Sequence, residues 1–131
     1  MLSVSYKGLN AYQIENEFLS LLILPQYGCK LASLYKKDTG REFLFQSPRE
    51  NLTPPPYAAA FSAYDSSGFD EVFPSIDACP YPLGKHRGIP IPDHGEVWAL
   101  PWQHTLHADG LGLTGWTQSP ALPYRFTRDL T

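Results

Sequence analysis

The stretch KLASLYKKDTGREFLF, residues 30–45, decides the fold class of this chain. Residues 30–35 have the composition of a β-strand, and so do residues 42–45. Between them, residues 36–40 combine lysine, aspartate and glycine, which is typical of a hairpin turn. The stretch therefore predicts two antiparallel strands joined by a tight turn.

The chain before this hairpin continues the same pattern. We expect short strands at residues 2–6 and 11–15, and then a buried apolar strand at residues 19–24 that Pro25 ends. A bend at residues 27–29 leads into the hairpin. The sequence up to residue 45 therefore predicts an antiparallel meander.

Residues 46–95 lose this regularity. The run Pro54-Pro55-Pro56 excludes a helix or a central strand, and the alanine-rich residues 57–64 are compatible with one helical turn. Aromatic side chains recur through the segment: Phe61, Tyr64, Phe69, Phe73 and Tyr81. Long structureless segments in compact domains are usually functional or disordered. Because this one is rich in aromatic residues, we expect an ordered, packed loop that forms a site.

Regular structure returns after residue 101. Residues 102–107 and 111–116 are predicted strands around a turn, and residues 124–131 form a last strand with no turn signal after it. This ending indicates a chain cut inside a sheet. We therefore expect one all-β domain over residues 1–131, an antiparallel and incomplete β-sandwich with long ordered loops.

Composition excludes several classes of function. Of 131 residues, 43% are hydrophobic and 18% are charged, which is typical of a globular domain rather than a disordered tail. The net charge of −3, without a Lys/Arg cluster, argues against nucleic acid or an anionic membrane as partner. The apolar residues 18–24 are too few to span a bilayer. Cys29 and Cys79 form no C-x-x-C motif, and two buried free thiols would suit the cytoplasm, where we place the protein.

Residues 91–102, IPDHGEVWALPW, contain the strongest candidate site. They bring together a histidine, two carboxylates and two tryptophans: His94, Asp93, Glu96, Trp98 and Trp102. Aromatic walls with a few fixed polar groups suit a flat ring ligand, so His94 is predicted to point into a sugar site. The alternative is a loop that enters a strand, with both tryptophans in the core and His94 on the surface.

Two further patterns allow different chemistry. The adjacent carboxylates Asp70 and Glu71 could bind sugar hydroxyls or serve as acid and base, but neighbours on extended chain point apart, so loop capping is the alternative. His94, Glu96 and His104 could form a cupin-like metal site. The spacing lacks the second histidine such a site needs, and we expect neither metal nor cofactor.

Three segments resemble aldose 1-epimerase, or galactose mutarotase-like, proteins. Residues 24–42 carry the runs P-x-x-G-x-x-[IL]-x-S-L and T-G-R-E. Residues 68–74 carry a Gly-aromatic-Asp-Glu-x-Phe-Pro pattern, and residues 92–102 contain a His-Gly segment followed by two tryptophans. The segments follow one another in the family's order and cover most of residues 11–102.

The resemblance implies a galactose mutarotase-like sandwich that binds sugars in a cleft across one sheet. It assigns His94 as the catalytic histidine near the sugar ring oxygen. The expected substrate contacts are Asp70, Glu71, Asp93, Glu96, Trp98 and Trp102. The family's second histidine and its glutamate base would lie beyond residue 131, so the chain corresponds to the N-terminal portion of the family fold.

We therefore expect carbohydrate binding, to a sugar or sugar phosphate, with anomer interconversion if the missing half of the site is supplied. The alternatives are a non-catalytic sugar-recognition module and the cupin-like enzyme. A half-sandwich exposes an apolar face, which predicts a homodimer. The side chains expected near its covered surface are Leu19, Leu21, Ile23, Trp116 and Phe126.

Overall fold

The computed structural model describes residues 2–131, which form ten β-strands in three antiparallel sheets and no α-helix. The strands are β1 (Leu2–Tyr6), β2 (Leu9–Glu15), β3 (Leu19–Leu24), β4 (Lys30–Lys36), β5 (Arg41–Glu42), β6 (Cys79–Pro80), β7 (Pro90–Ile91), β8 (Gln103–Leu106), β9 (Leu113–Gln118) and β10 (Arg125–Leu130). Three 3-10 helices add η1 (Phe61–Ala63), η2 (Gly84–His86) and η3 (Val97–Ala99). The all-β prediction is confirmed.

The first sheet has the order β1-β2-β3-β4-β5, so each strand pairs with its neighbour in sequence. This confirms the predicted meander. The prediction for residues 42–45 was wrong, because β5 ends at Glu42. The Glu42 carboxylate accepts the backbone N–H groups of Leu34 and Leu44, while the backbone N–H of Phe43 still donates to the carbonyl of Leu34. Phe43 and Phe45 are exposed.

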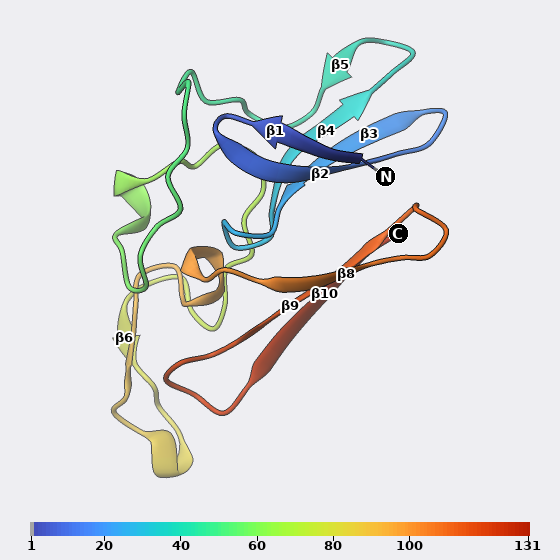
Figure 1. Cartoon of the computed structure of the whole chain (residues 1–131). Helices are drawn as coiled ribbons and strands as arrows, with labels where there is room; N and C mark the ends of the chain where they lie inside the picture. The colour runs from blue at the N-terminus through green and yellow to red at the C-terminus, as the bar shows by residue number, and fades with distance from the viewer. Residues whose placement is uncertain (1) are drawn as a thin grey trace.

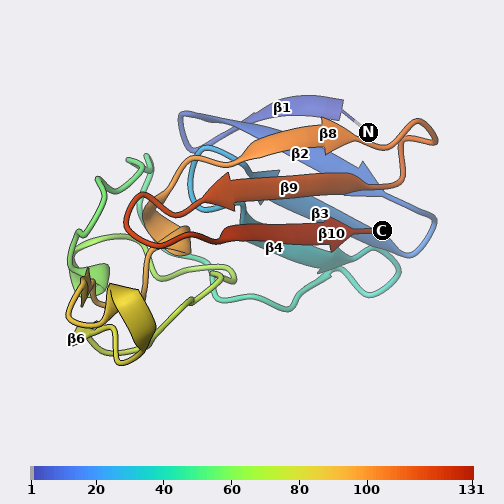
Figure 2. The same ribbon diagram turned by 90° about the horizontal axis from the view of Figure 1, so that it is seen from below.

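The second sheet has the order β10-β9-β8. It stacks over the first sheet as a second layer, as Figure 2 shows. Along β9, Leu113, Gly115 and Thr117 are buried and alternate with more exposed residues, so one face of this sheet packs inward. The result is a two-layered, sandwich-like arrangement with both chain ends at the same end of the layers (Figure 1).

The core between the layers joins residues from both sheets and from η3. Its central cluster contains Ile14, Ile23, Cys29, Val97, Trp102 and Leu113, with Phe126 packed against it. Ile23 and Phe126, expected near a dimer surface, thus pack within one chain. Trp116 lies on the opposite face of its sheet from this core.

The long segment between the sheets is ordered, as expected. Its 57–64 region contains a single turn of 3-10 helix, η1, and β6 and β7 form a small ribbon that projects from the body together with η2 (Figure 1). Two isolated bridges fasten the segment to the body: an antiparallel one between Leu31 and Phe69 and a parallel one between Phe73 and Gly95.

Two sequence expectations concern the surface. Cys29 is buried, but Cys79 lies exposed in β6, so the expectation of two buried thiols was wrong for Cys79. Two-residue ribbons bury little, which leaves that thiol in solvent. No helix within residues 2–131 has the length and apolarity to cross a membrane.

Candidate functional site

His94 sits on a strained backbone and is held from two sides. Its φ of 57° lies in the left-handed region, which non-glycine residues seldom adopt. The Nδ1 atom lies 2.9 Å from Oδ1 of Asp93, and the imidazole stacks on the Phe61 ring with centroids 4.0 Å apart and planes 6° apart. Asp93 also accepts the backbone N–H of Phe61 through Oδ2, at 3.1 Å. One carboxylate therefore positions both the imidazole and the ring beneath it.

This arrangement orients the imidazole. An ionised carboxylate only accepts hydrogen bonds, so Nδ1 of His94 is the donor in this contact. Donation from His94, followed by the backbone N–H of Phe61, lowers the pKa of Asp93 and keeps it ionised. Within residues 2–131, Nε2 has no hydrogen-bond partner, and the side chain is 31% exposed. His94 therefore keeps one ring nitrogen free for a ligand.

A hollow of about 630 Å³ lies next to this segment, and His94 itself is not one of its lining residues. Asp93 lines it, and the remaining walls are largely apolar and come from the η1 approach and from β7. They include Tyr57, Ala58, Ala59, Ala60, Ile91 and Pro92. The volume falls in the range of small-molecule sites.

Gly95 allows the histidine segment to lie directly against residues 68–74. A Cβ on Gly95 would stand 2.1 Å from the carbonyl oxygen of Phe73, and the glycine has a φ of 72°. Phe73 in turn accepts the backbone N–H of Glu96 at 2.8 Å. Only glycine fits this position, so steric crowding by Phe73 explains why a glycine follows His94.

Glu96 is fully buried and does not reach solvent, in contrast to its predicted role as a sugar contact. Three hydroxyls donate to its carboxylate: Tyr57 to Oε1 at 2.7 Å, and Ser119 and Tyr124 to Oε2 at 2.7 and 2.6 Å. Burial, followed by donation to Glu96, raises the pKa of Tyr57 to about 12 and raises that of Tyr124. Glu96 therefore ties the loop, η3 and the β9–β10 turn together.

The carboxylates at positions 70 and 71 point to different partners. Asp70 is buried against the Nζ of Lys30 at 2.7 Å, and Glu71 pairs with Arg128 at 3.1 Å. Burial raises the pKa of Asp70, although the Lys30 charge opposes the rise. The two carboxylates therefore face apart and form no acid–base dyad, and their alternative role as loop anchors agrees with these contacts.

Both predicted aromatic walls lie in the core. Trp98 is 1% exposed and Trp102 is 4% exposed, so neither offers a ring face to a sugar. Their indole N–H groups donate inward, from Trp98 to the carbonyl of Asp93 at 3.3 Å and from Trp102 to that of Val97 at 2.9 Å. Trp98 packs edge-on against Phe61, the ring on which His94 stacks. Both tryptophans therefore lie in the core, as the alternative interpretation of this segment expected, and Trp98 supports the ring beneath His94.

The three residues considered for a metal site lie in separate surroundings. Glu96 is enclosed by hydroxyls, His94 is held by Asp93, and His104 packs against the Tyr12 ring at 4.8 Å. Within residues 2–131, no group of three histidine, cysteine or acidic side chains is arranged to hold a metal ion.

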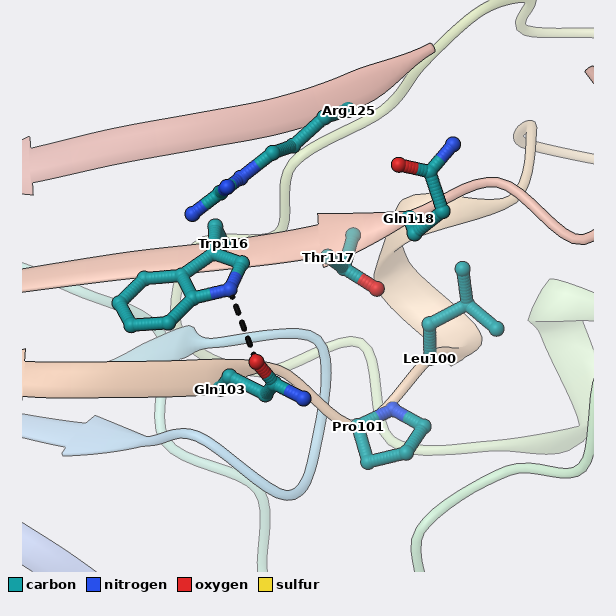
Figure 3. Close-up of a pocket in the computed structure, with 7 residues that line it drawn as sticks. All are labelled: Leu100, Pro101, Gln103, Trp116, Thr117, Gln118 and Arg125. Atoms are coloured by element: carbon teal, nitrogen blue, oxygen red, sulfur yellow. Dashed lines mark hydrogen bonds between the residues drawn. The ribbon is translucent and has the colours of Figure 1, made fainter. Parts of the chain in front are cut away.

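A second hollow, of about 440 Å³, lies on the outer face of the three-stranded sheet (Figure 3). Its residues come from β8, β9, β10 and the approach to β8: Leu100, Pro101, Gln103, Trp116, Thr117, Gln118 and Arg125. Sequence reasoning missed it and placed Trp116 on a covered surface. In the structure Trp116 alternates with the buried Gly115 and Thr117 and so faces outward, which the sequence LTGWTQ does not reveal.

Comparison with known proteins gives this chain no family. No family model matches its sequence, and no curated protein matches it. A function is therefore proposed from the chain's own residues.

Proposed function

We propose that this chain binds an aldose or aldose phosphate within an aldose 1-epimerase-like framework, with His94 in contact with the sugar. The galactose mutarotase-like form of the sandwich is part of the proposal. The observation that carries it is the partly exposed imidazole of His94, held by Asp93 and Phe61, where Asp93 also lines a hollow of ligand size.

The meeting of the three family-like segments supports the proposal. Gly28 donates its backbone N–H to the carbonyl of Leu100 at 3.0 Å, which joins the first segment to the third. The Leu31–Phe69 bridge joins the first to the second, and the Phe73–Gly95 bridge joins the second to the third. The three segments, far apart in sequence, thus contact one another through their backbones, and these contacts are a structural reason for the three motifs to occur together.

The chemistry available to His94 suits a sugar ring. Nε2 can accept a hydrogen bond from a hydroxyl, and the protonated imidazole can donate to a ring oxygen while Asp93 stabilises its charge. Anomer interconversion also requires a base at the anomeric hydroxyl. We therefore propose sugar binding as the function of this chain, with interconversion when a second group supplies that base.

Substitution of His94 tests the assignment. In His94→Ala, the affinity for galactose, glucose or glucose 6-phosphate should fall by about 1–3 kcal/mol, the usual cost of an unpaired polar group. Stability should change little, because the side chain is partly exposed. Isothermal titration calorimetry gives the affinity and urea unfolding gives the stability. His86→Ala, in the projecting ribbon, is the matched control, and unchanged affinity in a folded His94→Ala protein contradicts the assignment.

A non-catalytic sugar-recognition module is the second candidate. The burial of Glu96 and of the Asp70 side chain and the pairing of Glu71 with Arg128 favour it, because they remove three predicted carboxylates from acid–base chemistry and leave His94 with its partner Asp93. Polarimetry on freshly dissolved galactose and glucose separates the two candidates. Heat of binding with mutarotation no faster than in buffer identifies the module, and faster mutarotation identifies the epimerase.

A further inference from the structure

The outer-face hollow is built on two cross-strand pairs. Gln103 on β8 lies opposite Trp116 on β9, and Gln118 on β9 lies opposite Arg125 on β10. The backbone ladders therefore fix the spacing of these four residues. Because β9 alternates and Gly115 faces the core, the Trp116 ring stands on the solvent side (Figure 3).

The side chains of the hollow also hold one another. The indole N–H of Trp116 donates to Oε1 of Gln103 at 3.0 Å, and the Arg125 guanidinium lies 4.8 Å from the centre of the indole ring. Gln118 donates through Nε2 to the carbonyl of Tyr124. These contacts orient both amides and the guanidinium before any ligand arrives, which lowers the entropic cost of binding.

Each of these groups keeps free hydrogen-bonding capacity. Within residues 2–131, Nε2 of Gln103 and Oε1 of Gln118 have no hydrogen-bond partner, and the Arg125 guanidinium forms no ion pair. The hollow therefore offers an amide donor, an amide acceptor and a cationic donor around one space. Leu100 and Pro101 add an apolar wall on the remaining side (Figure 3).

We propose that this hollow is a second binding site, for the hydroxylated ring of a monosaccharide. A sugar hydroxyl both donates and accepts, so neighbouring hydroxyls match the donor and acceptor amides, while ring C–H groups match Leu100, Pro101 and the Trp116 edge. A volume of about 440 Å³ accommodates one ring. The proposal draws on these residues alone and does not rest on the role of His94.

The buried Glu96 gives the hollow its rigidity. Ser119 and Tyr124, which donate to Glu96, stand immediately beside Gln118 and Arg125 in the chain. The β9–β10 turn is therefore anchored in the core at both of its ends. Tyr57, which lines the hollow next to Asp93, also donates to Glu96, so one buried carboxylate contacts residues beside both hollows.

The three tryptophans provide separate reporters of the two sites. The indole N–H of Trp116 belongs to the outer-face hollow, that of Trp98 contacts the carbonyl of Asp93 next to His94, and that of Trp102 lies in the core. Each gives one signal in a nitrogen–proton correlation spectrum, assigned by single Trp→Phe variants. D-galactose and D-glucose are titrated separately until the shifts saturate.

The proposal predicts a saturable shift of the Trp116 signal, while the Trp102 signal stays fixed. A Gln103→Ala/Gln118→Ala variant should bind at least tenfold more weakly at this site and keep a folded spectrum. Thr105→Ala, on the same strand but outside the hollow, is the matched control and should bind like the unchanged protein. A static Trp116 signal at the highest soluble sugar concentration, or the same shift in the double variant, overturns the proposal.

The reporters also separate this proposal from the assignment of His94. A shift of Trp98 alone leaves the His94 site standing and overturns the second site. A shift of Trp116 alone supports the second site and removes support from His94. A spectrum in which neither signal moves overturns both.

Discussion

Lys30 is a charged side chain with no exposed surface. Its ammonium donates to the carbonyls of Asp65 and Ser67 and to the carboxylate of Asp70, and it lies 5.2 Å from the centre of the Tyr27 ring. Three donors thus meet three oxygens, which is the condition under which a buried ammonium is tolerated. The residue fastens β4 to the loop that carries Asp70.

Removal of this charge should be costly. Lys30→Met leaves a buried carboxylate without its cation, and we expect a loss of about 3–5 kcal/mol in the free energy of unfolding. Lys36→Met is the matched control, because Lys36 and Asp38 form an exposed pair at 3.3 Å that should contribute less than about 1 kcal/mol. Urea denaturation measures both losses, and equal losses would contradict the structural role of Lys30.

At this scale the sequence does not reveal which polar side chains are buried. His94 and Asp93 are adjacent in sequence, and their side chains contact each other. The burial of Lys30 could not be foreseen, because two of its acceptors are backbone carbonyls more than thirty residues away. Glu96 and Asp70 were expected to contact a sugar but are buried for the same reason: their partners come from distant parts of the sequence.

The β4–β5 hairpin depends on one carboxylate. Glu42 accepts the Ser33 hydroxyl and the backbone N–H groups of Leu34 and Leu44. Burial alone would raise the pKa of Glu42, but these hydrogen bonds outweigh it and lower the pKa below 4.5. The folded state therefore favours the ionised form of Glu42 more strongly than the unfolded state does.

This shift gives the hairpin a defined pH dependence. The depressed pKa means that Glu42 contributes stability above its unfolded pKa of 4.5 and loses it as the pH falls through the lower folded value. The difference in unfolding free energy between the unchanged protein and Glu42→Gln should be largest at neutral pH and should shrink below pH 4.5. Urea denaturation over a pH series measures it. Ser33→Ala, which removes one donor, should reduce this pH dependence, and a difference that stays constant with pH would refute the prediction.

Strands that pair with their neighbours in sequence were predictable as elements. The meander and the β8–β9 hairpin follow from short apolar runs separated by turn residues. The β6–β7 ribbon was not predicted, because its pairs join Cys79 to Ile91 and Pro80 to Pro90 across a long connection. Local patterns carry no information on such contacts.

At the scale of the whole molecule, the two layers leave an apolar hollow of about 280 Å³. Ile14, Leu19, Leu21, Leu34, Leu111 and Leu130 contribute its apolar lining. Leu19 and Leu21 were among the residues expected at a dimer surface. Leu111 is more than half exposed, and exposed apolar patches commonly mark contacts between proteins.

We propose that two copies associate through this hollow. Sedimentation equilibrium across a hundredfold dilution should show a dimer that dissociates on dilution. Leu111→Glu should shift the equilibrium to the monomer, because it places a charge in the apolar contact. Leu83→Glu, at a somewhat more exposed leucine in the projecting ribbon, should leave the association unchanged. A monomer at every concentration would contradict the proposal.

The joint between the two sheets also has a consequence for thiol chemistry. Cys29 lies fully buried beneath Gly115 of β9, and Arg128 of β10 donates to its carbonyl. Burial raises the pKa of the Cys29 thiol to about 11, so the reactive thiolate is scarce at neutral pH even when a reagent can enter. Cys79 stands in solvent on the ribbon. Thiol reagents therefore meet one accessible cysteine while the sheets stay together, and the second becomes available only when they separate.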